Sequence, residues 1–251
     1  MSGHSKWSTI KRKKGAADAR RGKVFTQLIR ELTVAARHGG GDPVGNPRLR
    51  MAIDKARAQN MPKDNIERAV KKGTGELAGE SYEEIRYEGY GPGGVAIIVD
   101  AVTDNRNRTV SELRHLFSKF GGNLGSTGCV AYLFEPYGVL LFDTGDRDAD
   151  ALAEAAIEAD ASDVIEDGDT LEIRTEPQAL HRVQAALEEA GFSAESASLQ
   201  LVPSTTQKLS GKEAQTMLRL YEALDLHEDV NQVYANFDIS DDEMRQLMDA
   251  G

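Results

Sequence analysis

The run Ile85–Val102, IRYEGYGPGGVAIIVDAV, decides the fold class of this 251-residue chain. Its two halves, Ile85–Tyr90 and Val95–Val102, are rich in β-branched and aromatic residues and flank the glycine-rich GYGPGG, which predicts a β-hairpin. A helix over residues 108–120, the loop GGNLGSTG and a strand over Cys129–Phe134 are predicted next. This ββαβ unit is an incomplete layer, so we expect later segments of the chain to complete it.

Residues 137–203 predict a unit that is complete by itself. Its order of strand, helix, strand, strand, helix and strand is that of the ferredoxin-like fold, in which a four-stranded sheet carries two helices on one face. The strands are predicted over residues 137–142, 163–165, 171–174 and 197–202, and the helices over residues 147–159 and 177–190.

The C-terminal residues predict the two elements that the ββαβ unit lacks. These are a helix over Lys212–Leu224 and a strand over Asn231–Asn236. We therefore predict a discontinuous α/β domain of residues 78–135 and 205–251, with a ferredoxin-like α/β domain of residues 136–204 inserted in it.

Residues 1–77 predict a basic tail followed by a domain of three helices, each of roughly 13–16 residues. Residues 1–21 have only Trp7 and Ile10 as large apolar side chains, too few to offset chain entropy, so we expect this stretch to be disordered when free. From Val24 onward apolar residues recur at three- and four-residue spacing, which predicts the first helix.

Local signals predict the ends of the next two helices. Asn46 is a good N-cap for the second, and Pro47 suits its first helical position. Gly73 is expected just beyond the end of the third, in the left-handed conformation that glycine favours there. The fold class predicted for the whole chain is therefore α+β multidomain, with a three-helix domain followed by two α/β domains.

Charge is distributed unevenly along the sequence. Residues 1–75 carry 18 Lys and Arg against 6 Asp and Glu, a net charge of +12, whereas residues 76–251 carry 12 and 35, a net charge of −23. The overall pI near 5.0 conceals this split. Such asymmetry is typical of a module that binds nucleic acid or another polyanion, joined to acidic domains.

The candidate nucleic-acid contacts are mainly cations, which neutralise phosphates and release counterions. Trp7 is included because its ring could stack on an unpaired base. The polar loop TDNRNR, residues 103–108, adds two arginines. The alternative for this loop is purely structural, with Asp104 or Asn105 turning the chain and Asn107 capping the next helix. The candidates are Lys6, Trp7, Lys11, Arg12, Lys13, Lys14, Arg20, Arg21, Lys23, Arg30, Arg106 and Arg108.

Several classes of protein are disfavoured by composition. The single cysteine, Cys129, excludes an internal disulfide and fits a reducing compartment. No apolar run approaches the roughly 18 residues of a membrane-spanning helix, and no apolar segment follows the basic N-terminus as in a secretory signal. We therefore expect a cytoplasmic protein with no membrane partner.

No catalytic or metal-binding pattern is evident in the sequence. GYGPGG contains G-x-G-x-x-G, but a strand follows it where a dinucleotide site needs a helix, so a hairpin turn is favoured. GGNLGSTG has the composition of a backbone anion nest, yet it precedes a strand, so a plain loop is favoured. The five histidines are scattered without metal-ligand spacing. We predict a protein that is not an enzyme and needs no metal, cofactor or small-molecule substrate.

Long motifs in this chain closely resemble those of the YebC/PmpR family. They include SGHSKWSTIKRKK (2–14), NMPKDNIERAVKKG (60–73) and FGGNLGSTGCVAYLF (120–134). The resemblance implies an N-terminal helical domain, two α/β domains and no enzymatic activity. It also implies a DNA-binding, probable transcriptional regulator, while relatives that include a mitochondrial translational activator act on translation at the ribosome.

Two functions are consistent with these observations. The leading prediction is a regulator of gene expression that binds DNA, and the alternative is a ribosome-associated translation factor that binds rRNA through the same basic surface. Oligomeric state is left open by the sequence. We also hypothesise that the acidic domains compete with nucleic acid for the basic surface, because the two are tethered in one chain.

Overall fold

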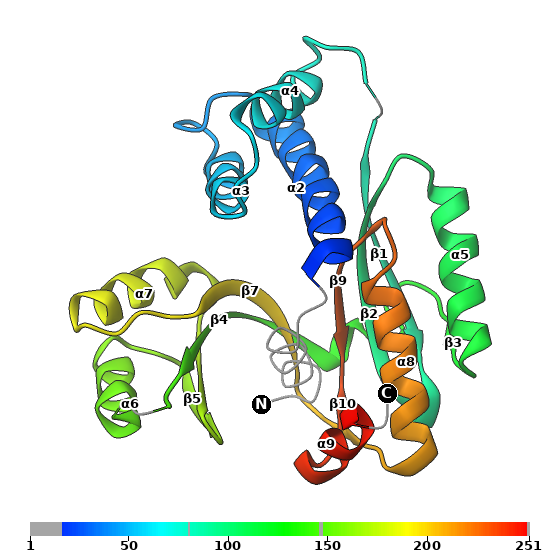
Figure 1. Ribbon diagram of the computed structural model, residues 1–251, viewed down its shortest axis with the longest axis vertical. Helices are drawn as coiled ribbons and strands as arrows, with labels where there is room; N and C mark the ends of the chain where they lie inside the picture. Colours follow the sequence, from blue (N-terminus) through cyan, green and yellow to red (C-terminus); the bar gives the residue numbers. More distant parts are fainter. Residues whose placement is uncertain (1–16, 80, 146–147, 250–251) are drawn as a thin grey trace.

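The computed structural model describes residues 17–79, 81–145 and 148–249 (Figure 1). A helical N-terminal part is followed by two four-stranded antiparallel sheets, and each sheet carries helices on one face. The chain is therefore an α+β protein of several parts, as the sequence predicts. The predicted domain boundaries after residues 77, 135 and 204 stay predictions.

The N-terminal part consists of α2 (Ala17–Gly39), α3 (Pro47–Ala58) and α4 (Lys63–Gly73). The first of these begins seven residues before Val24, so the expected disorder is wrong for residues 17–21. Alanine, arginine and lysine are strong helix formers, and they extend a helix without needing to bury an apolar face. The other two helices, of 12 and 11 residues, are shorter than predicted.

Asn46 caps α3 as predicted, and it also holds α2 in place. Its side-chain oxygen accepts a hydrogen bond from the backbone N–H of Leu49 at 3.1 Å. Its side-chain nitrogen donates to the carbonyls of Ala35 at 2.8 Å and Gly40 at 2.9 Å, which lie at the end of α2. One buried amide therefore satisfies backbone groups of two helix ends.

Gly73 has a different role from the one predicted. It lies inside α4, and Thr74 is the C-cap. A Cβ atom on Gly73 would lie 2.4 Å from the carbonyl oxygen of Thr33 and 2.7 Å from the Cβ of Ala36, both in α2. The glycine is therefore required by the close approach of α2 and α4, a tertiary contact that local sequence rules do not reveal.

The first sheet has the strand order β3-β1-β2-β9. The predicted hairpin is confirmed as β1 (Glu83–Tyr90) and β2 (Ala96–Thr103), with the short 3-10 turn η1 (Pro92–Gly94) between them. β9 (Val230–Ala235) pairs with β2, so the C-terminal part completes this sheet as expected.

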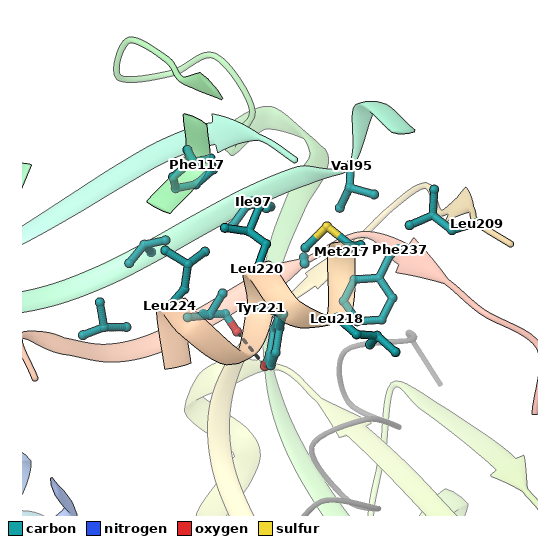
Figure 2. Packing of buried hydrophobic residues seen from close by; sticks show 14 of the residues in the cluster. Val95, Ile97, Phe117, Leu209, Met217, Leu218, Leu220, Tyr221, Leu224 and Phe237 are labelled. Carbon is teal, nitrogen blue, oxygen red and sulfur yellow. Dashed lines mark hydrogen bonds between the residues drawn. The ribbon is translucent and has the colours of Figure 1, made fainter. Parts of the chain in front are cut away.

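Helices α5 (Arg106–Lys119) and α8 (Gly211–Asp225) cover one face of this sheet. Figure 2 shows Leu220 and Leu224 of α8 packed near Ile97 and Phe117. The glycine-rich turn is pressed against the same helix, since a Cβ on Gly91 would lie 2.8 Å from the sulfur of Met217. The predicted hairpin turn GYGPGG is therefore confirmed, and it packs against helix α8.

The second sheet has the order β5-β6-β4-β7, which is the ferredoxin-like arrangement predicted from the sequence. Its helices α6 (Ala149–Glu158) and α7 (Leu180–Glu189) pack on one face, and the 3-10 turn η3 (Pro177–Ala179) precedes α7. The strands are β4 (Phe134–Asp143), β5 (Asp163–Asp167), β6 (Thr170–Thr175) and β7 (Ser196–Pro203).

The strand predicted over Cys129–Phe134 is wrong. Residues Ala131–Leu133 form the 3-10 turn η2, and the strand that joins the first sheet is β3 (Asn123–Leu124), inside the predicted loop. The cause is Glu88, whose buried carboxylate accepts hydrogen bonds from backbone N–H groups at the end of the loop and just beyond it.

Those three donors are the amides of Gly128, Val130 and Ala131, at 2.7, 2.9 and 2.9 Å from the Glu88 carboxylate. Burial acts to raise the pKa of Glu88, but the three amides outweigh it, so the pKa lies below its ordinary value. The backbone anion site considered for GGNLGSTG therefore involves one residue of that loop, and its anion is the protein's own carboxylate.

Short elements follow the second sheet. Strands β8 (Gln207–Lys208) and β10 (Phe237–Asp238) pair in parallel, and α9 spans Asp241–Asp249. The sequence analysis predicted none of these elements, and for β8 and β10 the reason is that two-residue strands leave no periodic pattern.

We expect Gly73→Ala to lower the free energy of unfolding by about 1–3 kcal/mol, because the added methyl group overpacks the contact between α4 and α2. Gly22→Ala in α2 is the matched control. A Cβ there meets nothing within 4 Å, so the better helix former should stabilise the protein by about 0.5–1 kcal/mol. Urea denaturation followed by circular dichroism measures both changes, and stabilisation by both variants would contradict the proposed close contact.

Candidate nucleic-acid interface

Exposed cations gather on α3 and α4. Several of them lie near acids on the surface, such as Lys55 with Glu31 at 3.5 Å and Lys63 with Glu67 at 3.4 Å. Exposed pairs of this kind contribute at most about 1 kcal/mol, so they give way readily to a phosphate. The exposed cations of these two helices are Arg48, Arg50, Lys55, Arg57, Lys63, Arg68 and Lys71.

Arg68 and Lys71 of α4 are the most available of this group. Both are exposed, and within residues 17–79, 81–145 and 148–249 neither has an ion-pair partner. Arg48 is the least available, because its guanidinium makes a bidentate hydrogen bond to the carboxylate of Glu84. That hydrogen bond lowers the pKa of Glu84 from its ordinary value and raises that of Arg48.

A groove of about 610 Å³ lies between α3, α4 and the loop after α2. Its floor is apolar, and its rim carries both signs of charge, with Arg57, Lys63 and Lys71 beside Asp42, Glu67 and Glu76. The mixed rim does not favour phosphate. The helical surface outside this groove, together with the basic N-terminal residues, is the better candidate for a polyanion.

Arg30, one of the predicted nucleic-acid contacts, lies inside the protein. Its Nη1 atom is 2.9 Å from Asp229 Oδ1, and it donates to the carbonyls of Glu228 at 2.6 Å and Val102 at 3.3 Å. Its guanidinium also lies 5.6 Å from the centre of the Tyr82 ring. The Arg30 side chain is only 9% exposed, so it holds α2 against the first sheet and presents little surface to a ligand.

Arg108, at the start of α5, meets the same carboxylate. Its Nη2 atom donates to Asp229 Oδ2 at 2.9 Å and to Asp104 Oδ1 at 2.9 Å. The structure thus brings together two predicted contacts, Arg30 and Arg108, around an acid that the sequence analysis did not single out. In the sequence Asp229 is only the second of two adjacent acids, Glu228 and Asp229, that precede the strand predicted over Asn231–Asn236.

Asp229 is 1% exposed and is held by hydroxyl groups as well as by arginines. Thr109 Oγ1 donates to its Oδ2 at 2.7 Å and Thr103 Oγ1 at 3.2 Å. Burial acts to raise the pKa of Asp229, but the hydrogen bonds from Thr109 and Arg108 and the charge of Arg30 outweigh it. The pKa therefore lies below its ordinary value, and the carboxylate is ionised in the folded protein.

The remaining polar loop residues have distinct positions. Asn105 caps α5 by accepting from the backbone N–H of Arg108 at 3.1 Å, so the expectation that Asn107 is the cap is wrong. The helix begins at Arg106, two residues earlier than predicted, which places Asn107 within its first turn. Arg106 is exposed and available to a ligand.

The other predicted contacts belong to the N-terminal segment. Arg20 and Arg21 lie in the first turns of α2, and Lys23 is half-buried in the same helix. Lys6, Trp7, Lys11, Arg12, Lys13 and Lys14 lie outside the described residues.

Glu112, His227 and Asp229 form the one cluster in the described part of the chain that could hold a metal ion. His227 Nδ1 accepts from the backbone N–H of Asp229 at 3.1 Å, so its Nε2 carries the proton and donates to Glu112 at 2.9 Å. A protonated ring nitrogen is not a ligand atom, and Asp229 is already bound by two arginines. The geometry therefore indicates that His227 serves as a hydrogen-bonding residue and not as a metal ligand.

Two family models match this sequence. The TACO1/YebC protein N-terminal domain matches residues 5–76, and the TACO1/YebC second and third domain matches residues 82–237. The chain belongs to the TACO1/YebC family. The resemblance stated from the sequence motifs is therefore confirmed.

Relatives and a solved structure agree with this assignment. Proteins of Geobacter sulfurreducens and Citrifermentans bemidjiense are 60% and 59% identical over 248 residues, which cover 99% of this chain and 100% of theirs. Both are named probable transcriptional regulatory proteins. The crystal structure of a conserved hypothetical protein, Aq1575 from Aquifex aeolicus, is 50% identical with a TM-score of 0.81, covering 89% of this chain and 93% of that one.

Among the residues described, no helix of this TACO1/YebC family member is both long enough and apolar enough to span a membrane.

We expect Asp229→Asn to lower the free energy of unfolding by about 3–5 kcal/mol, because the buried Arg30 loses its compensating charge. Glu84→Gln, which weakens the exposed pair with Arg48, is the control and should cost at most about 1 kcal/mol. Urea denaturation compares the two variants. Equal decreases in the free energy of unfolding for the two variants would show that Asp229 does not hold the structure together.

The contribution of Asp229 should also depend on pH. Because its folded-state pKa is depressed, the stabilisation is fully present above its unfolded pKa of about 3.9 and is lost as pH falls through the folded value. The difference in unfolding free energy between the wild type and Asp229→Asn should therefore be constant near neutral pH and shrink below about pH 4. A difference that grows in acid would contradict this linkage.

Proposed function

We propose that this protein is a cytoplasmic, non-enzymatic regulator of gene expression that binds nucleic acid, most directly as a DNA-binding transcriptional regulator. The observation that carries the proposal is the charge of +12 within residues 1–75, set against −23 in the rest of the chain. A basic surface attached to acidic domains suits a polyanionic ligand. The names of its relatives agree with a role in transcription.

The proposed interface consists of the basic N-terminal segment together with the exposed cations of α3 and α4. Arg30 is left out, because its guanidinium is bound internally by Asp229 and two carbonyls. Arg108 is given a structural role because its guanidinium is held by the carboxylates of Asp104 and Asp229. Arg106, exposed at the start of α5, stays a proposed contact.

Phosphate contacts by lysine and arginine side chains carry no sequence information, so the choice between DNA and RNA is a matter for experiment. Trp7 would favour unpaired bases by stacking. The alternative, a translation factor on rRNA, uses the same cations. Binding to a short DNA duplex is therefore compared with binding to an rRNA hairpin of matched length.

Affinity should fall steeply with salt. If 6–10 phosphates are contacted, binding weakens by about 10³–10⁵ between 50 and 200 mM salt. Fluorescence anisotropy with both labelled nucleic acids measures this dependence. An affinity that is indifferent to salt would overturn the proposal, and tighter binding to the hairpin than to the duplex would favour the rRNA alternative.

Neutralising Lys11, Arg12, Lys13 and Lys14 to glutamine should reduce the slope of log K against log salt on duplex DNA by about 3–4, since each contacted phosphate contributes about 0.9. A matched control removes four exposed cations from the C-terminal half by changing Lys208, Lys212, Arg219 and Arg245 to glutamine. The control alters net charge equally and should leave the slope unchanged. An equal reduction of this slope in both variants would indicate a nonspecific charge effect.

A further inference from the structure

Among the described residues, helices cover one face of the ferredoxin-like sheet and no helix lies over the other, which is called the helix-free face below. Leu140, Phe142 and Ile173 lie in the core beneath α6 and α7. Side chains alternate along a strand, so Val139, Leu141 and Glu172 point to the opposite, helix-free face. In the pairing register, Leu141 lies opposite Glu172 on one side and Ser196 on the other, and Val139 lies between Arg174 and Ser198.

The centre of this helix-free face is buried. Val139, Leu141 and Glu172 are 1%, 3% and 1% exposed. Within the part of the chain that the structure describes, the hydrophobic cluster on this face draws its members from β4 and β7 alone, with Val202 and Tyr137 as the others. The centre of this face is therefore shielded from water although no described helix lies over it.

The hydrogen bonding of Glu172 indicates the charge of a segment that would bind the helix-free face. Its Oε1 accepts from Arg174 Nε at 2.7 Å, but its Oε2 is buried without a partner among the described residues. A buried carboxylate oxygen that lacks a hydrogen bond is costly, so this position favours a cationic donor.

The net charge of the surrounding residues disfavours nucleic acid on this face. Residues 136–204 carry 3 Lys and Arg against 16 Asp and Glu, a net charge of −13. Phosphates are repelled by such a field, whereas a basic peptide is attracted. The occupant should therefore combine several cations with a few apolar side chains.

We propose that the helix-free face of the ferredoxin-like sheet binds the chain's own N-terminal segment, residues 1–16. This segment contains Lys6, Lys11, Arg12, Lys13 and Lys14 and no acid, and its large apolar residues are Trp7 and Ile10. The lysines and arginine complement Glu172, and the apolar side chains complement Val139 and Leu141.

The segment has the reach that this contact requires. Sixteen residues span up to about 50 Å when extended, starting from Ala17 at the beginning of α2. α2 runs along the first sheet, where Gln27 donates to the carbonyl of Val230 in β9 at 2.5 Å. In Figure 1 the beginning of α2 lies on the side of the second sheet away from α6 and α7.

Docking gives the acidic domains a regulatory role. The cations that would contact phosphates are then held by the protein itself, and nucleic acid must displace them. This regulatory consequence rests on the proposed function, but docking of the segment does not. If only undocked molecules bind nucleic acid, the apparent affinity for nucleic acid is reduced in proportion to the undocked fraction. With about 10% of molecules undocked, a variant that no longer docks should bind nucleic acid about tenfold more tightly.

Trp7 is the only tryptophan in the chain, so its fluorescence reports on the segment without a label. In the full-length protein without nucleic acid, we expect Trp7 emission at shorter wavelength than in urea and protection from acrylamide. Glu172→Gln, which removes the charge at nearly constant shape, should shift the emission to longer wavelength and increase quenching. Ser198→Lys, on the same face, should do the same by repulsion.

Glu166→Gln is the matched control. Glu166 is exposed on β5 and pairs with Leu171, on the helix-covered side of the sheet, so the same charge change should leave Trp7 emission unaltered. Thermal unfolding confirms that all variants are folded. Wild-type emission that already matches the urea-unfolded chain would overturn the proposal. So would a shift that disappears on dilution, because docking would then involve a second copy.

Affinity for the DNA duplex separates the two proposals. Glu172→Gln should tighten binding about tenfold, while Glu166→Gln should not. If the wild type and every variant fail to bind nucleic acid while the emission shifts occur as expected, the proposed function fails and docking stands. If binding is tight and unaffected by Glu172→Gln, with exposed Trp7, docking fails and the function stands.

Discussion

The carboxylate of Asp229 holds together parts of the chain that are remote in sequence. Arg30 from α2 and Arg108 from α5 both bind it, and Thr103 and Thr109 complete its hydrogen bonds. Removing charges from water is expensive, so such a site forms only when opposite charges and hydroxyl donors are positioned together. The helical part is joined to the first sheet through this contact, and the position of α2 depends on it.

The same network divides the cations of this TACO1/YebC family member into two groups. Arg30 and Arg108 are both engaged by Asp229, Arg30 in the interior and Arg108 at the surface, whereas Arg68, Lys71 and Arg106 are exposed without such a partner among the described residues. Residue type does not separate the groups, because arginine occurs in both. The acids also differ in role: Glu88 organises a loop through backbone amides, and one oxygen of Glu172 has no hydrogen-bond partner among the described residues on the helix-free sheet face.

Local rules predicted much of the fold. The hairpin, the ferredoxin-like order and the Asn46 cap depend on neighbouring residues and on alternation, which a sequence displays directly. The failures have tertiary causes. The strand expected after Cys129 is replaced by a turn because Glu88 binds its amides, and Gly73 is needed for the approach of two helices.

The sequence alone determined the family, the segregation of charge and the succession of helices and strands, because motifs, composition and periodicity are properties of the linear chain. The tertiary structure decided which arginines bind Asp229, how Glu112, His227 and Asp229 are already hydrogen-bonded, and which face of the second sheet has no described helix over it. These properties depend on burial and on pairing between distant residues. Arg30 and Asp229 are 199 positions apart, and nothing in the local sequence of either reveals the other.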